Sequence, residues 1–240
     1  MTRWFAGAKR RQRVPLTRRP VRRARSARRT PHASGAAGSR SDASNFVISW
    51  TREPRNDFGI FSKGYTRAAE RLATLLLEAP RFSDYEAYPV VFLYRHALEL
   101  SLKHVIYRSV ELAAYRYIDD IGDRLHNVHD LCRLAKTASA SLTLLFPEDE
   151  FLRKVASVLD NTCAELSELD PDSYAYRYPI DKKGRPSTKK NQRVNLAAFA
   201  THMSSLLEDL DTVHFGLSGE IYIAQDALYE TVRSNLSAGA

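Results

Sequence analysis

The chain is short of several features that define common protein classes. Its 240 residues include two cysteines, Cys132 and Cys163, with no CxxC pair and no partner histidine at zinc-ligand spacing. Both thiols are expected to be buried apolar side chains in a reducing, cytoplasmic setting, and no metal or other cofactor is predicted. No apolar run approaches the roughly 20 residues that a membrane helix needs. Arginines interrupt the N-terminus too often for a secretory signal.

Sequence motifs of several enzyme classes are missing as well. The chain has no Gly-rich phosphate loop, no HExxH and no GxSxG, so P-loop, metalloprotease and hydrolase functions are not supported. Four histidines fall in one part of the chain, but their spacing matches no metal-site pattern. These histidines are His96, His104, His126 and His129.

The positive charge of the chain is concentrated in one segment. Residues 1–40 hold twelve Arg, one Lys and no acid, which is a net charge of +13. Of the 36 Lys and Arg in the chain, 23 remain for the other residues, against 28 acids, which is a net charge of −5. The overall charge of +8 therefore comes from the N-terminal segment, and the folded part is predicted to be mildly acidic.

The first 45 residues are predicted to form a disordered basic tail. Arg, Ser, Ala, Pro and Gly dominate it, and such a composition cannot bury enough apolar surface to offset the chain entropy lost on folding. Three interpretations stay open: an arm that contacts nucleic acid non-specifically, an organelle transit peptide, or a start site assigned too far upstream. The folded domain is then expected over residues 46–240.

The rest of the chain carries the spacing of amphipathic helices. Apolar side chains recur every three and four residues, and Pro or Gly separates the stretches. Strand patterns are few, the best being Phe46 to Trp50. We therefore expect an all-α bundle of five or six helices. The expected helices cover about 61–78, 88–118, a stretch from a cap at Asn127 through 135, 148–166, 196–210 and 221–236, with a polar break at 119–124 and a long loop at 169–192.

Three ionisable residues stand four apart in the second expected helix. Arg95, Glu99 and Lys103 would stack on one helix face, beside the apolar stripe rather than opposite to it. Two interpretations stay open for this ladder. It packs as a structural ion-pair network against the loop after the fourth helix, or it lines a polar pocket that receives a ligand phosphate.

The long loop combines aromatic and basic residues. Tyr174, Tyr176 and Tyr178 alternate with other residues, so three rings fall on one side of an extended segment. Single-stranded RNA binders use such rings next to flexible cations, whereas rings that pack the loop onto the bundle would give the same pattern. The cations that follow the rings are Lys182, Lys183, Arg185, Lys189, Lys190 and Arg193.

Three motifs follow one another in the order of these helices. Glu99-Leu100-Ser101-Leu102-Lys103 falls in the second helix, His129-Asp130-Leu131 opens the third, and Arg177-Tyr178-Pro179 precedes the last long one. In this order they resemble the ExxxK, HDL and RYP motifs of the HEPN superfamily. The stretch from Arg95 to Leu100 also resembles a group of uncharacterised bacterial members. The resemblance covers about residues 60–215.

The resemblance implies an up-and-down bundle of four or five helices that is often a homodimer and binds nucleotides or RNA. Many members are metal-independent ribonucleases of toxin or phage-defence systems, with an Arg-x(4–6)-His site near the start of the last core helix. In this chain Arg193 and His202 are separated by eight residues. Arg124 and His129 are separated by four, although the family does not place its pair in the HDL turn. The candidate catalytic residues are therefore His129 and Arg124, and the candidate ligand-binding residues are Arg95, His96, Glu99, Lys103, Arg177, Tyr178, Lys182, Lys183 and Arg185.

Two functions from different classes follow. The first is a HEPN-like domain that binds RNA or a nucleotide and, as a ribonuclease, would use His to move the 2′-hydroxyl proton and Arg to stabilise the phosphorane. The second is a non-catalytic, dimerising interaction module. Convergence of Arg95, His129 and Arg177 at an open cleft favours the first function, and a sealed, mutually paired cluster favours the second.

Overall fold

The structure is a computed structural model that describes residues 58–79, 81–118, 128–170, 176–181, 183–187 and 193–238. These residues belong to one compact unit and form an all-α bundle, which confirms the predicted fold class. The expected tail of residues 1–45, the strand signal at 46–50, Arg124 and Lys182 lie outside the described residues. Within the described ranges, none of the helices has an apolar stretch of bilayer-crossing length.

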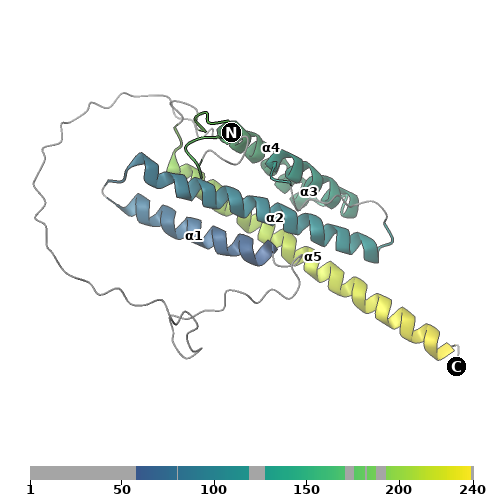
Figure 1. The fold of residues 1–240 in the computed structure, drawn as a ribbon. Helices are drawn as coiled ribbons and strands as arrows, with labels where there is room; N and C mark the ends of the chain where they lie inside the picture. The colour runs from purple at the N-terminus through teal and green to yellow at the C-terminus, as the bar shows by residue number, and fades with distance from the viewer. Residues whose placement is uncertain are drawn as a thin grey trace, which may run out of the picture. The chain divides into compact units, whose positions relative to one another are not determined.

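Five α-helices and one short 3-10 turn make up the described part of the chain (Figure 1). The predicted end of the first helix at Glu78 is confirmed, as is the start of the second at Tyr88-Pro89, where proline lies in the first turn. In chain order the elements are α1 (Phe58–Glu78), η1 (Asp84–Ala87), α2 (Tyr88–Tyr115), α3 (Leu131–Leu145), α4 (Glu150–Leu169) and α5 (Leu196–Ala238).

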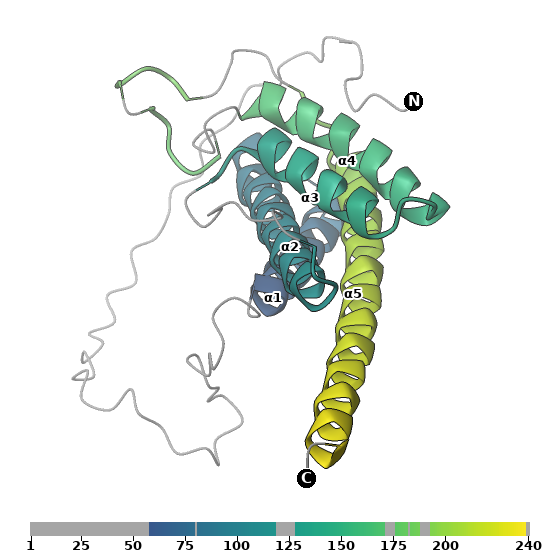
Figure 2. The same cartoon turned by 90° about the vertical axis from the view of Figure 1, so that its right-hand side faces the viewer.

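The central element is α2, which contacts α1, α3 and α5. Sixteen of its 28 residues are buried, because neighbouring helices cover it on most sides. Apolar residues are therefore spread around α2 instead of forming the single stripe of a surface helix. Figure 2 shows α3 and α4 lying side by side across one side of this helix.

The polar contacts between α2 and α3 set the direction of α3. Arg95, early in α2, donates to the backbone oxygen of His129, just before α3, at 3.4 Å. Arg116, just after α2, donates to the backbone oxygen of Leu145, the last residue of α3, at 3.1 Å. The two helices therefore run in the same direction, unlike consecutive helices of the up-and-down bundle that the resemblance implies. Apolar periodicity alone does not determine the direction in which a helix packs, so the sequence contains no sign of this arrangement.

The starts of α3 and α4 are fixed by aspartate caps. The predicted cap at Asn127 is wrong, because α3 begins at Leu131 and the side chain of Asp130 accepts the backbone N–H of Arg133 at 3.1 Å. Asn127 itself lies outside the described residues. At α4, where a helix was expected over 148–166, the carboxylate of Asp149 accepts the backbone N–H of Leu152 at 3.0 Å.

The last helix, α5, is continuous through the two glycines that were expected to end it. Gly216 and Gly219 each cost a helix about 1 kcal/mol relative to alanine. Leu217 and Ile221, however, are buried, and full burial of such side chains contributes about 1.5–3 kcal/mol each. Packing therefore outweighs the local preference of glycine, and the expected separate helix at 221–236 is the second half of α5.

Candidate functional site

The ladder on α2 is buried. The exposed fractions of Arg95, Glu99 and Lys103 are no more than 4%. Lys103 Nζ donates to Glu99 Oε1 at 2.9 Å, and Arg95 lies 3.6 Å from the other oxygen of Glu99. Arg95 Nε also lies 3.5 Å from the carboxylate of Asp170, the residue that caps the C-terminal end of α4. The ladder therefore joins α2 to α4 as well as neutralising itself.

His129 forms the outer edge of this cluster. Its Nδ1 lies 2.8 Å from Glu99 Oε1, while 64% of its side chain is exposed. Burial by itself would raise the pKa of Glu99, but the hydrogen bonds and charges of Lys103 and His129 lower that pKa below its usual range. Glu99 is thus a carboxylate that can only accept, so Nδ1 of His129 carries the hydrogen. This contact holds the imidazole in one orientation.

Arg177 reaches the cluster from the segment after α4. Its guanidinium lies 5.6 Å from the ring centre of Phe92 and 5.9 Å from that of Tyr178, both cation–π distances. Burial lowers the pKa of His96, and the charge of Arg177 lowers it further, so His96 is neutral at neutral pH. The ring of His96 stacks on Phe92 at 5.7 Å.

The charges around Arg95 come from distant parts of the chain. Among the described residues, Glu99, Asp170 and Arg177 all act on it. Burial lowers the pKa of Arg95, the two carboxylates oppose that shift, and Arg177 adds to it. Within the part of the chain that the structure describes, the buried Nε of Arg95 makes no hydrogen bond, although it lies 3.5 Å from the Asp170 carboxylate. Arg95 therefore lies between two carboxylates, with a second arginine nearby.

The basic turn after Pro179 makes its contacts apart from this cluster. Asp181 accepts the backbone N–H groups of Lys183 and Arg185 at 2.8 and 2.9 Å, and the Arg185 side chain at 2.8 Å. Hydrogen bonds from Arg185 and Lys183 lower the pKa of Asp181. Gly184, with φ of 73°, completes the turn. Arg185 is therefore engaged within the turn, which follows Tyr178 in the chain.

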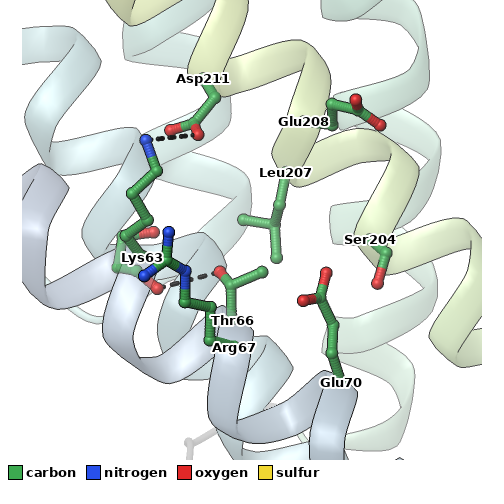
Figure 3. Close-up of a pocket in the computed structure, with 9 residues that line it drawn as sticks. Lys63, Thr66, Arg67, Glu70, Ser204, Leu207, Glu208 and Asp211 are labelled. Atoms are coloured by element: carbon green, nitrogen blue, oxygen red, sulfur yellow. Dashed lines mark hydrogen bonds and ion pairs between the residues drawn. The ribbon is translucent and has the colours of Figure 1, made fainter. Parts of the chain in front are cut away.

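A second polar region lies between α1 and α5, where a hollow of about 300 Å³ opens (Figure 3). Lys63 closes one end by pairing with Asp211 at 2.9 Å. The charged residues that line the hollow are three acids and two bases, and none of them belongs to the predicted site. The lining residues are Ser62, Lys63, Thr66, Arg67 and Glu70 from α1 and Ser204, Leu207, Glu208 and Asp211 from α5.

Next to this hollow, a serine, a histidine and an aspartate follow one another. Ser101 Oγ lies 3.4 Å from His214 Nε2, and His214 Nδ1 lies 3.7 Å from Asp211. The residue types match those of a hydrolytic triad. However, the exposed fraction of Ser101 is 1%, so no substrate carbonyl can reach its oxygen. The chain of contacts is therefore a polar link between α2 and α5, not a nucleophile site.

Comparison with known proteins gives no match: no family model, curated protein or solved structure is similar to this chain. Among the described residues, no group of three or more His, Cys, Asp and Glu side chains is placed to hold a metal ion. The function is therefore inferred from the geometry of the cluster on α2.

The structure brings six of the predicted site residues together: Arg95, His96, Glu99, Lys103, His129 and Arg177. Tyr178 borders them through Arg177. Lys183 and Arg185 contact Asp181 instead, and Arg124 and Lys182 lie outside the described residues. The site residue that the sequence does not reveal is Asp170, because it falls at the start of the long polar loop expected over 169–192. Its one signal is its position directly after Leu169, the last apolar residue of α4.

Proposed function

We propose that this chain is a HEPN-like helical domain that binds the phosphate groups of RNA or of a nucleotide. The observation that carries the proposal is the meeting of Arg95, His129 and Arg177, from α2, the start of α3 and the segment after α4. Residues 34 and 82 positions away from Arg95 come near it. An exposed arginine and an exposed histidine above a buried, paired layer of charges favour an anionic ligand.

The cluster has two layers with different roles. The buried layer of Arg95, Glu99 and Lys103 is paired internally and holds the rim in place. The rim consists of His129, held by Glu99, and Arg177, placed over Phe92. The rim is the part that contacts a ligand, because phosphate oxygens can reach it without opening the ion pairs beneath.

Exposed rings next to the rim favour a nucleic acid over a bare phosphate. Tyr178 and Tyr88 are both exposed, and Tyr88 lies 6.0 Å from the ring of Tyr176. Bases stack on such rings with about 1–3 kcal/mol each, with little dependence on sequence. We infer that single-stranded RNA is the ligand that uses both the cations and the rings.

A ribonuclease activity would follow from the orientation of His129. With Nδ1–H donated to Glu99, Nε2 can take the proton of a 2′-hydroxyl as its oxygen attacks the phosphorus. The bond to the 5′-oxygen then breaks, this oxygen takes a proton from water, and the products are a 2′,3′-cyclic phosphate and a 5′-hydroxyl. Arg177 would stabilise the phosphorane charge. Arg124 was expected in this role and stays a prediction.

Binding is tested by the fluorescence anisotropy of a labelled single-stranded RNA in EDTA at low salt, with ATP as competitor. Arg177→Ala removes one charged contact worth about 1.5–3 kcal/mol, so affinity should fall about 10- to 100-fold. Arg153→Ala, an exposed arginine at the start of α4, is the matched control and should bind as the unmodified chain does. Absence of binding to both RNA and ATP, or equal affinity of Arg177→Ala, would reject the proposal.

Cleavage is a separate readout in the same buffer. RNA cut in EDTA by the unmodified chain but not by His129→Ala would assign the reaction to His129. Binding without cleavage would leave a binding domain, which is part of the same proposal.

The second candidate function is a non-catalytic, dimerising interaction module in a cytoplasmic setting. The sealed ladder favours it, because Arg95, Glu99 and Lys103 are already paired. It predicts that Arg177→Ala and His129→Ala leave every ligand affinity unchanged. Exclusion of the chain from a cytosolic fraction would contradict the setting.

A further inference from the structure

The second half of α5 extends past the other helices (Figures 1 and 2). Its last hydrogen bond to α2 joins Gln225 Nε2 to Tyr115 Oη at 3.0 Å. Residues 225–237 are all exposed. At 1.5 Å per residue these residues make a free helical segment about 20 Å long. An isolated helix of this length is marginal in water, so the segment gains from a packing partner.

Four of the exposed apolar residues in α5 recur with a period of seven, whereas Ile223 and Leu228 lie outside this repeat. Phe215, Tyr222, Tyr229 and Leu236 are each seven residues apart, and their exposed fractions lie between 65% and 84%. Val232 stands three residues after Tyr229 and is also exposed. We call these five residues the heptad stripe. A seven-residue repeat keeps one seam facing a neighbouring helix, which is the spacing of a coiled coil.

We propose that the heptad stripe is the surface through which two copies of this chain pair, stripe against stripe. The partner helix in a coiled coil needs a seven-residue apolar repeat of its own. The α5 helix of a second copy of this chain has that repeat. A two-fold axis lets the same patch serve both subunits, so one stripe on each copy is enough.

The area of the stripe is adequate for a stable pair. A specific interface buries about 800 Å² on each partner. Aromatic side chains bury about 150–250 Å² each, so covering the exposed parts of the three rings removes roughly 300–550 Å² from water. The exposed parts of Val232 and Leu236 and the stems of flanking residues supply the remainder.

The charges around the stripe disfavour a lipid surface as the partner. Glu220, Asp226 and Glu230 outnumber Arg233 in this segment, and Glu220 is paired with Arg116. Helices that lie on anionic membranes carry Lys and Arg along the polar face instead. The acidic flanks therefore repel anionic lipid but are tolerated at the solvent edge of a helix pair.

Sedimentation velocity of the full chain, from low to high micromolar concentration, tests the proposal. The unmodified chain should shift from monomer to dimer across this range. Tyr222→Glu with Tyr229→Glu places four charges in one seam of the dimer and should keep the chain monomeric, with at least a tenfold weaker association. Gln225→Leu should tighten association, because it replaces a polar residue beside the seam with an apolar one.

The matched control is Thr231→Glu with Ser234→Glu, which adds the same charge to the opposite side of the segment. This control should dimerise as the unmodified chain does, and circular dichroism should show equal helix content in both double variants. A chain that stays monomeric throughout, or a dimer that survives Tyr222→Glu with Tyr229→Glu, overturns the proposal. It stands independently of RNA binding, which the monomeric variant should retain in the anisotropy assay.

Discussion

Two charged regions flank α2, and they differ in how much water reaches them. On the side of α3 and α4, Arg95, Glu99 and Lys103 are almost fully buried and paired with one another. On the side of α1 and α5, the Lys63–Asp211 pair lines an open hollow, and its two side chains are 55% and 44% exposed. The residue types and distances are similar. Burial therefore decides which pair is essential for the fold and which contributes little.

The largest effect is expected from removing the carboxylate at the centre of the buried region. Glu99→Gln removes the carboxylate that pairs with Lys103 and Arg95, and breaking a buried pair in this way costs about 3–5 kcal/mol. Urea unfolding measures the loss. The control is Glu99→Met with Lys103→Met, which removes both partners and should recover most of the stability. A loss below about 1 kcal/mol for Glu99→Gln would contradict the role of burial, given the cost of unpaired charge.

A histidine beside the second region gives an effect that depends on pH. Burial, with the neighbouring His214 and Arg108, lowers the pKa of His104 from 6.5 to about 3, and its Nδ1 has no hydrogen-bond partner among the described residues. In the unfolded chain the imidazole of His104 takes up a proton below pH 6.5, whereas in the folded chain it does so only near pH 3. The contribution of neutral His104 to stability is therefore complete above pH 6.5 and is lost at about 1.4 kcal/mol per pH unit as the pH falls through this window.

Between pH 6.5 and 4.5, the slope of the unfolding free energy against pH depends on His104 and not on the carboxylates. The stabilising contribution of Glu99, whose pKa is lowered, is lost only below its ordinary value of 4.5. His104→Leu should flatten the slope, although His96 and His202, which also have lowered pKa values, maintain part of it. An unchanged slope in His104→Leu would show that His104 titrates normally in the folded chain.

The smallest effect is expected at the exposed pair. Lys63→Ala removes the 2.9 Å contact with Asp211, and exposed pairs contribute about 0.2–1 kcal/mol. Interactions with His214 and Lys63 lower the pKa of Asp211 to about 2, and this pKa should rise in the variant. Urea unfolding at low and high salt checks the change, since salt screens exposed charges. A loss of unfolding free energy above about 2 kcal/mol would show that this exposed pair stabilises the fold as much as a buried pair does.

The helices were predictable from the sequence because each of them has to bury apolar residues at a fixed period. The end of α1 and the start of α2 follow from proline chemistry, and both are confirmed. The break at Gly216 was wrong because a local preference of about 1 kcal/mol was weighed without the packing of Leu217 and its neighbours.

The environment of the ladder was not predictable in the same way. A spacing of four residues is the same for a solvated row of ion pairs and for a buried one. The difference depends on α3 and α4 covering α2, and on Asp170 meeting Arg95 from a distant part of the chain. No local pattern encodes such a contact, so the two interpretations could be stated from the sequence but not separated.

The tripeptide His129-Asp130-Leu131 performs three tasks in three consecutive positions. His129 reaches Glu99, Asp130 caps α3, and Leu131 is buried in the core. Sliding α3 by a single residue would misplace all three groups together, with no compensating arrangement among the neighbours. Insertions and deletions should therefore be far less tolerated beside this tripeptide than at any exposed turn, and the alignment of the rim with α2 is fixed to one residue.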